Sequence, residues 1–182
     1  MNYSVFFSRI EIGMDIALTK IKSILPKNPK VVILPWAFPT ELDANLLDND
    51  FFKKGERRYN KYVNELKKLG ILLTPKQEQD LDTYYKLLIS YNNNVNLTAI
   101  TKEEDVYLKH FYDSLTLFKG IDLKENLKIC DLGTGAGFPG LVLKIVFPNL
   151  SITLVDSLEK RIKFLDLVIK ELELKNIKTV HS

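Results

Sequence analysis

The pattern of apolar positions in the C-terminal part of the chain alternates between short buried strands and amphipathic helices. Apolar runs at 127–132 and 151–155 are short, continuous and bounded by turn residues, which is typical of buried parallel strands. Helical spacing follows each of them, at 138–146 and 158–172, and a third strand is expected at 177–180. Strands that alternate with helices predict a parallel sheet with helices on its faces.

Two amphipathic helices are expected before these strands. The segment Thr-Pro-Lys-Gln at 74–77 is a capping-box signature with proline at the first helical position, so a helix is expected from there to about Asn92. The signature recurs as Thr-Lys-Glu-Glu at 101–104. It predicts a second helix, whose expected apolar stripe consists of Val106, Leu108, Phe111 and Leu115.

Residues 1–70 show a different organisation. Apolar positions between 14 and 25 have helical spacing, and the run at 31–34 predicts a short buried strand. The pattern at 51–69 predicts another helix, for which Gly70 is a plausible end. We therefore expect a small N-terminal α/β segment, and we place a domain boundary between residues 70 and 71.

Composition adds broad limits to this picture. The chain has 182 residues, 46% of them hydrophobic and 27% charged, which is ordinary for one globular domain with at most a small appendage. No apolar run approaches the roughly 18 residues that a membrane span needs, and Arg9, Glu11 and Asp15 interrupt any signal-peptide core. The single cysteine, Cys130, cannot form an internal disulfide. We expect a cytoplasmic protein that has no membrane partner.

A glycine-rich loop lies between the first expected C-terminal strand and the next helix, which is the context in which such loops bind nucleotides. Glycines fall at Gly133, Gly135 and Gly137, whereas dinucleotide-binding loops read G-x-G-x-x-G. Asp131 precedes the loop, where a carboxylate would repel a pyrophosphate but suit a cationic group such as the ammonium of S-adenosylmethionine. The loop and Asp131 together favour S-adenosylmethionine over NAD.

An acidic residue, Asp156, ends the second of these strands. A carboxylate at this place can accept hydrogen bonds from both hydroxyls of a ribose. Because NAD and S-adenosylmethionine share that diol, Asp156 alone does not distinguish them. Ser157, which follows it, is counted among the expected cofactor contacts. A nicotinamide-binding domain and a glycine-rich turn without a ligand remain as alternatives.

Four stretches within residues 72–182 carry a family resemblance. They read YYKLLISYNNNVNLTAIT (84–101), VYLKHFYDSL (106–115), ICDLGTGAGFPGLVL (129–143) and LVDSLEKRIKFL (154–165). The glycine loop is common to many methyltransferases, whereas the first two stretches and the GFPG ending of the third are far more specific. This part of the chain resembles the bacterial small-subunit ribosomal RNA methyltransferase G family, also called glucose-inhibited division protein B.

The resemblance implies a Rossmann-like fold and methyl transfer from S-adenosylmethionine to N7 of a guanine in the 16S rRNA of the small ribosomal subunit. It implies cofactor contacts at Gly133, Phe138 and Asp156. N7 of guanine carries a free lone pair, so its attack needs no prior deprotonation, and positioning alone can supply about 7–11 kcal/mol. We therefore assign no general base or other catalytic residue, and we expect no metal.

The resemblance is incomplete at both ends. Residues 71–182 would supply the N-terminal helices and first half of a methyltransferase domain, so we expect an incomplete sheet and a truncated, weak or inactive enzyme. Residues 28–69 loosely resemble the opening of peptidase E-like serine hydrolases, which have a class I glutamine-amidotransferase-like fold, but their nucleophile turn has no counterpart here. The alternatives are an inactive S-adenosylmethionine-binding or scaffold fragment of a gene fused near 64–71, a hydrolase remnant, or a small-molecule methyltransferase.

Several charged residues have both a functional and a structural interpretation. Lys109, Lys160 and Arg161 could bind RNA phosphates, although charges on helix faces are usually solvated. His110 and Asp113 are three positions apart on an expected helix and face the same side. They could lie near the active site, but a structural hydrogen bond is the favoured interpretation.

Overall fold

The computed structural model describes residues 4–6, 31–33, 55–121, 123 and 126–182. Its strands form one parallel sheet, in which the order of the strands follows the order in the chain. The strands are β1 (Ser4–Phe6), β2 (Val31–Ile33), β3 (Lys128–Leu132), β4 (Ser151–Asp156) and β5 (Ile177–His181). The predicted C-terminal α/β alternation is therefore confirmed.

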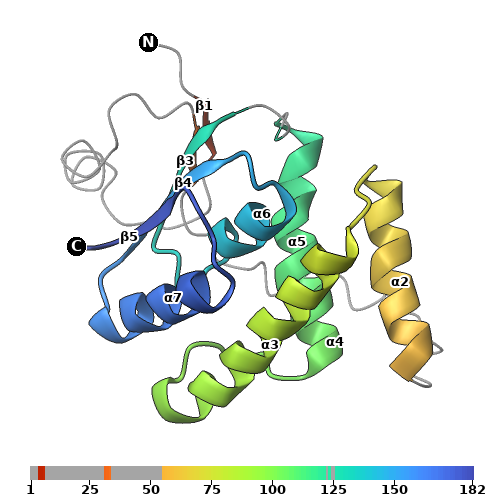
Figure 1. Cartoon of the computed structure of the whole chain (residues 1–182), viewed down its shortest axis with the longest axis horizontal. Coiled ribbons are helices and arrows are strands. Elements are labelled where there is room, and N and C mark those ends of the chain that lie inside the picture. The colour runs from red at the N-terminus through yellow and green to blue at the C-terminus, as the bar shows by residue number, and fades with distance from the viewer. Residues whose placement is uncertain (1–3, 7–30, 34–54, 122, 124–125) are drawn as a thin grey trace.

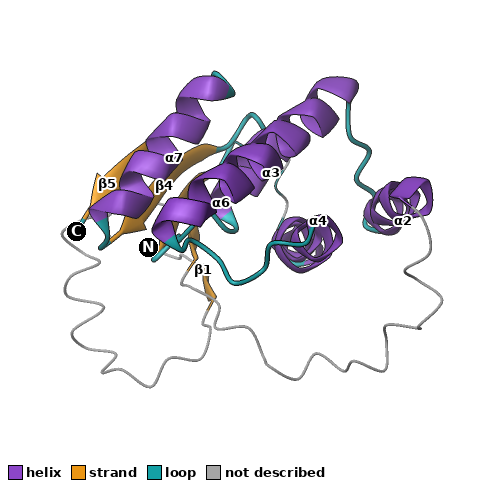
Figure 2. Cartoon of the chain, turned by 90° about the horizontal axis from the view of Figure 1, so that it is seen from below, coloured by secondary structure: helices purple, strands orange, loops and turns teal. Residues whose placement is uncertain are grey.

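The helices of the described residues gather on one face of this sheet (Figure 1). They are α2 (Gly55–Lys68), α3 (Pro75–Val95), α4 (Glu103–Val106), the π-helix η3 (Tyr107–Tyr112), α5 (Asp113–Leu115), the 3₁₀-helix η4 (Thr116–Lys119), α6 (Gly140–Val146) and α7 (Glu159–Glu171). Both α6 and α7 contact β4, and α3 packs against both of them, whereas α2 lies farthest from the sheet and contacts η3 (Figure 2). None of the helices in the described part of the chain is long and apolar enough to cross a membrane.

The core lies between the sheet and these helices. Strand residues Ile129 and Leu154 are fully buried, as are Leu88 of α3 and Phe164 of α7. On β3 the thiol of Cys130 is also buried, and burial raises its pKa to about 12. This thiol therefore stays protonated at neutral pH and is a poor nucleophile.

The predicted capping box at the start of α3 is confirmed. Thr74 Oγ1 accepts the Gln77 N–H, and Gln77 Oε1 accepts the Thr74 N–H at 2.8 Å. The other end of the Gln77 amide donates to the carbonyls of Ile145 and Val146, at 3.3 and 2.9 Å. One side chain thus caps α3 and joins it to the end of α6. The helix continues beyond the predicted end, to Val95.

Replacing Gln77 by alanine is expected to destabilise the protein by about 1–2 kcal/mol, because one cap and two carbonyl contacts are lost together. The exposed Gln79 lies on the same helix and provides a matched control, since Gln79→Ala should change the free energy of unfolding by less than about 0.5 kcal/mol. Urea unfolding of the two variants measures the difference. Equal effects would show that the Gln77 contacts add nothing beyond helix propensity.

The second predicted capping box is wrong. The helix begins at Glu103 with Lys102 in the cap position, so Thr101 lies one residue too early, and the Lys102 side chain makes no capping hydrogen bond. The predicted stripe is also partly wrong, because Leu108 is half-buried while Tyr107 and His110 are buried. The cause is η3, whose i→i+5 hydrogen bonds widen the turn and shift the buried face.

The helix predicted at 51–69 is confirmed as α2 for the residues described, and the predicted helix between 14 and 25 lies outside them. Gly70 ends α2 as expected, with φ +75° and its N–H donated to the Lys67 carbonyl. Leu66 and Leu69 of this segment join the same core as α3. Whether residues 1–70 have a separate origin stays a prediction.

Candidate functional site

The glycine loop leaves the carboxyl end of β3 and leads into α6. The N–H groups of Gly133 and Thr134 both donate to the Val155 carbonyl of β4, at 2.7 and 3.0 Å, which ties the loop to the neighbouring strand. Gly133, Gly135 and Gly137 have φ values of +66°, +63° and +104°. L side chains rarely adopt such angles, so the backbone itself requires the G-x-G-x-G spacing.

Gly137 and Gly140 are required for packing as well. A Cβ at Gly137 would lie 2.4 Å from Leu141 Cδ1. A Cβ at Gly140 would lie 2.3 Å from Leu154 Cδ2 and 2.7 Å from Asp131 Oδ2. Sequence analysis missed Gly140, although it ends the GFPG motif. Gly140 thus lets α6 approach the sheet closely, and Gly137 lets the loop pack against Leu141 and Tyr84.

The outer side of the loop is open as far as the described residues go. Among them, a Cβ built on Gly135 would meet only the Gly133 carbonyl oxygen, at 4.0 Å, and Gly133 itself is exposed. No side chain of the described residues therefore has to be displaced before a ligand reaches the backbone at Gly135. This is the cradle that a glycine-rich binding loop provides.

Asp131 is completely buried beneath this loop. Its Oδ2 accepts hydrogen bonds from Thr134 Oγ1 at 2.6 Å and from the Gly140 N–H at 2.9 Å. Its Oδ1 has no partner among the described residues. Burial raises the pKa of this carboxyl to about 7; the two hydrogen bonds lower it and nearby Asp156 raises it. An unsatisfied buried carboxylate oxygen is costly, and a cationic donor would relieve that cost.

Asp156 is also buried, at the end of β4. In the sheet register Asp131 pairs with Leu154, so Asp156, two residues further on, faces the same side as Asp131. Its Oδ2 accepts the Gly135 N–H at 2.9 Å, and Arg161 Nη1 lies 3.3 Å from the same oxygen. The structure thus brings both predicted carboxylates and the glycine loop together. Ser157, also predicted as a contact, is exposed directly beside Asp156.

Aromatic side chains of α3 and η3 pack against the glycine loop. The buried Tyr84 hydroxyl donates to the Ala136 carbonyl at 2.6 Å. The ring of Phe138 stacks on His110, with centroids 4.2 Å apart and planes 10° apart. Tyr84 also stacks on Phe111. Sequence analysis did not foresee these contacts; their only sign was that Tyr84 and His110 fall in stretches specific to one family.

His110 lies beside the glycine loop, against Phe138, as a neutral ring. Burial, assisted by the neighbouring Lys109, lowers the pKa of His110 to about 4. Its Nε2 lies 3.0 Å from Thr98 Oγ1. Lys109 itself pairs with Asp105 one turn earlier in the helix. These contacts give His110 a part in holding Phe138 in place.

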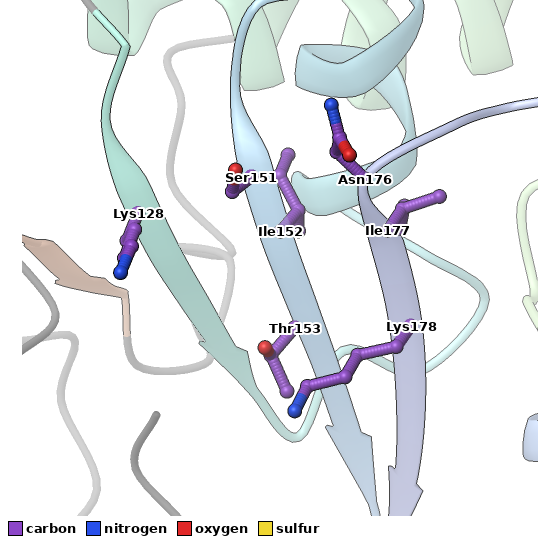
Figure 3. Close-up of a pocket in the computed structure, with 7 residues that line it drawn as sticks. All are labelled: Lys128, Ser151, Ile152, Thr153, Asn176, Ile177 and Lys178. Carbon is purple, nitrogen blue, oxygen red and sulfur yellow. The ribbon is translucent and has the colours of Figure 1, made fainter. Parts of the chain in front are cut away.

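A separate hollow of about 350 Å³ opens at the amino ends of the strands (Figure 3). Its lining includes Lys128 of β3, Ser151 and Thr153 of β4, and Asn176 and Lys178 at β5. The Lys178 side chain extends across β4 toward Thr153 (Figure 3). Because the glycine loop lies at the carboxyl ends of the same strands, this hollow is not part of the candidate site.

Comparison with known proteins agrees with the resemblance seen in the sequence. Residues 77–182 match the family model described as rRNA small subunit methyltransferase G. A protein named ribosomal RNA small subunit methyltransferase G from Staphylococcus carnosus is 53% identical over 120 residues, covering 66% of this chain and 50% of the relative. Its namesake from Streptococcus pyogenes is 50% identical over 122 residues, covering 66% of this chain and 52% of the relative.

The chain therefore spans about half the length of the curated relatives it matches. The matched region contains α3 from Gln77 onward, the helical segment 103–119, the glycine loop and both buried carboxylates. The family model covers more than half of the chain, and the family prediction is confirmed. This chain belongs to the rRNA small subunit methyltransferase G family.

Proposed function

We propose that this chain binds S-adenosylmethionine on the glycine loop and serves the methylation of guanine N7 in the small-subunit ribosomal RNA. The observation that carries the proposal is the buried carboxyl of Asp131, whose Oδ1 has no partner among the described residues. It lies on the same face as Asp156 and beneath a loop with an open outer side. The family name supplies the substrate class.

Each residue has a distinct task in this proposal. Asp131 would hold the ammonium group of the cofactor, and Asp156 the ribose diol. The backbone of Gly133, Gly135 and Gly137 would line the amino-acid part, with Phe138 and Ser157 at its margins. When bound, the cofactor supplies a methyl group activated by a sulfonium. The contribution of the protein is positioning, since guanine N7 needs no deprotonation before it attacks.

The alternative is a chain that binds the cofactor but transfers no methyl group. The residues that we propose for cofactor binding all fall within the matched region, so binding can be tested separately from methyl transfer. We further propose that residues 1–70 form a unit of separate origin, and that the protein acts in the cytoplasm, where ribosomes are.

Two measurements on the full chain test the proposal. Calorimetric titration with S-adenosylmethionine and S-adenosylhomocysteine should show binding, whereas NAD, in the same assay, should not bind. Transfer of labelled methyl groups to undermethylated small ribosomal subunits, with free guanosine as the competing acceptor, then tests the substrate. Binding with transfer to the subunits supports the whole proposal, and binding alone supports the alternative. No binding of either adenosyl compound would contradict both.

A further inference from the structure

The carboxylate of Asp156 has little capacity left for a ligand in this structure. An ionised carboxylate offers about four acceptor positions. The N–H groups of Gly135 and Leu158 each approach one oxygen at 2.9 Å, and Arg161 Nη1 lies 3.3 and 3.5 Å from the two oxygens. Only 1% of the Asp156 side chain is exposed. Two ribose hydroxyls therefore cannot reach it unless one donor leaves.

Arg161 is the donor that can leave. Its distances to Asp156 exceed the 2.7–2.9 Å or so that is usual for such a charged pair. Its Nε is buried and has no partner among the described residues. The side chain is 31% exposed, so its outer end already reaches solvent. The two backbone donors, by contrast, belong to the glycine loop and to the start of α7 and cannot move away alone.

We propose that Arg161 is the resting counter-ion of Asp156, and that the ribose diol of a bound adenosyl ligand displaces it. This inference rests on the proposed function. In the free protein the guanidinium neutralises the buried carboxylate and fills the place of the diol. On binding, the two hydroxyls take over those acceptor positions, while the hydrogen bonds from Gly135 and Leu158 remain. Arg161 is thus a positioning residue that acts through Asp156 and opposes binding.

Two ligands that differ only in the ribose diol can distinguish displacement of Arg161 from a general change in affinity. S-adenosylhomocysteine carries the diol, and its 2′,3′-dideoxy analogue does not. Because only the diol competes with Arg161, Arg161→Met should raise the affinity of the full chain for S-adenosylhomocysteine about two- to fivefold, the range expected when a partly exposed ion pair no longer has to be broken. The affinity for the dideoxy analogue should stay unchanged.

Two matched variants complete the calorimetric experiment. Arg161→Lys keeps a cation beside Asp156 and should bind S-adenosylhomocysteine much as the wild type does. Lys160→Met removes a charge from the neighbouring, exposed position and should change neither affinity. The displacement of Arg161 by the diol can also be tested with the wild type alone. High salt weakens a partly exposed ion pair, so the preference for the diol ligand over the dideoxy analogue should increase with NaCl.

Three results would overturn the inference. Weaker binding of S-adenosylhomocysteine to Arg161→Met, in a variant shown by thermal unfolding to be folded at the assay temperature, would mean that Arg161 supports the bound state. Equal changes for both ligands would show that the effect does not pass through the diol. A diol preference that is independent of salt would contradict it without any variant. Absence of binding in the wild type and all variants would instead contradict the proposed function, and the exchange with it.

Discussion

Asp131→Asn should weaken S-adenosylmethionine binding at least about 100-fold while making the protein more stable above pH 7. The two effects have one origin. The neutral amide can still accept hydrogen bonds from Thr134 and Gly140, but it removes the charge that would hold the ammonium group. A desolvated, charge-assisted contact of this kind is worth about 3 kcal/mol, which corresponds to about two orders of magnitude in affinity.

The stability effect has a definite sign. The pKa of Asp131 is about 7 in the folded protein and close to its ordinary value of 3.8 when the chain is unfolded. Between these values the folded protein holds a proton that the unfolded chain has released, so the free energy of unfolding falls as pH rises through this window. The amide of the Asp131→Asn variant does not titrate and should escape this loss, which makes the variant about 2–4 kcal/mol more stable than wild type at pH 8.

Urea unfolding at pH 5 and pH 8, with calorimetric titration of the ligand, measures both effects. Asp82→Asn is the control, because Asp82 is a surface carboxylate paired with Lys86 on α3. It should leave affinity unchanged and alter stability by less than about 0.5 kcal/mol. A stability gain without loss of binding would remove Asp131 from the ligand site. Loss of binding without a larger stability gain at pH 8 than at pH 5 would contradict the claim that burial raises the pKa of Asp131.

The second large effect is expected for Gly140→Ala. The new methyl group would overlap Leu154 and crowd Asp131 Oδ2, and both neighbours are buried with little room to shift. Overpacking of this kind typically costs 1–3 kcal/mol or so, and we expect a value near the top of that range, about 3 kcal/mol. Ligand binding should fall too, since the Gly140 N–H orients the Asp131 carboxylate.

Gly120→Ala is the matched control for that substitution. Within the described part of the chain, a Cβ at Gly120 would meet only the Leu117 carbonyl oxygen, at 3.9 Å, and the Gly120 φ of −109° suits any residue. Thermal unfolding should therefore show little change or a slight gain for Gly120→Ala and a clear loss for Gly140→Ala. Similar melting temperatures for the two variants would indicate that α6 can move away from the sheet without penalty.

Local patterns in the sequence were sufficient to predict several strands and helix ends of this protein. The strands β3, β4 and β5, the capping box at Thr74 and the end of α2 at Gly70 follow from apolar spacing and turn chemistry. The glycine spacing and Asp131 predicted where the loop lies because these residues are only a few positions apart in the chain. These features depend on neighbours within a few positions, which a sequence displays directly.

The remaining features depend on contacts between distant segments. Nothing near Tyr84 indicates that its hydroxyl meets the Ala136 carbonyl 52 residues away. The turn geometry of η3 changed which side chains are buried, and no apolar period predicts a π-helix. Arg161 was open to interpretation as a phosphate ligand, because its contact with Asp156 depends on how α7 leaves β4. Tertiary packing decided each of these cases.

The contacts of α3 limit how this protein can have been assembled during evolution. Gln77 joins α3 to α6, and Tyr84 joins α3 to the loop. A segment that began at β3 would therefore lack contacts that support the loop. Recombination that exchanges the preceding sequence can leave the loop intact only where the junction falls before Thr74. The boundary that we propose, between residues 70 and 71, meets this condition. A foreign N-terminus acquired there would keep the contacts that Gln77 and Tyr84 make with α6 and the loop.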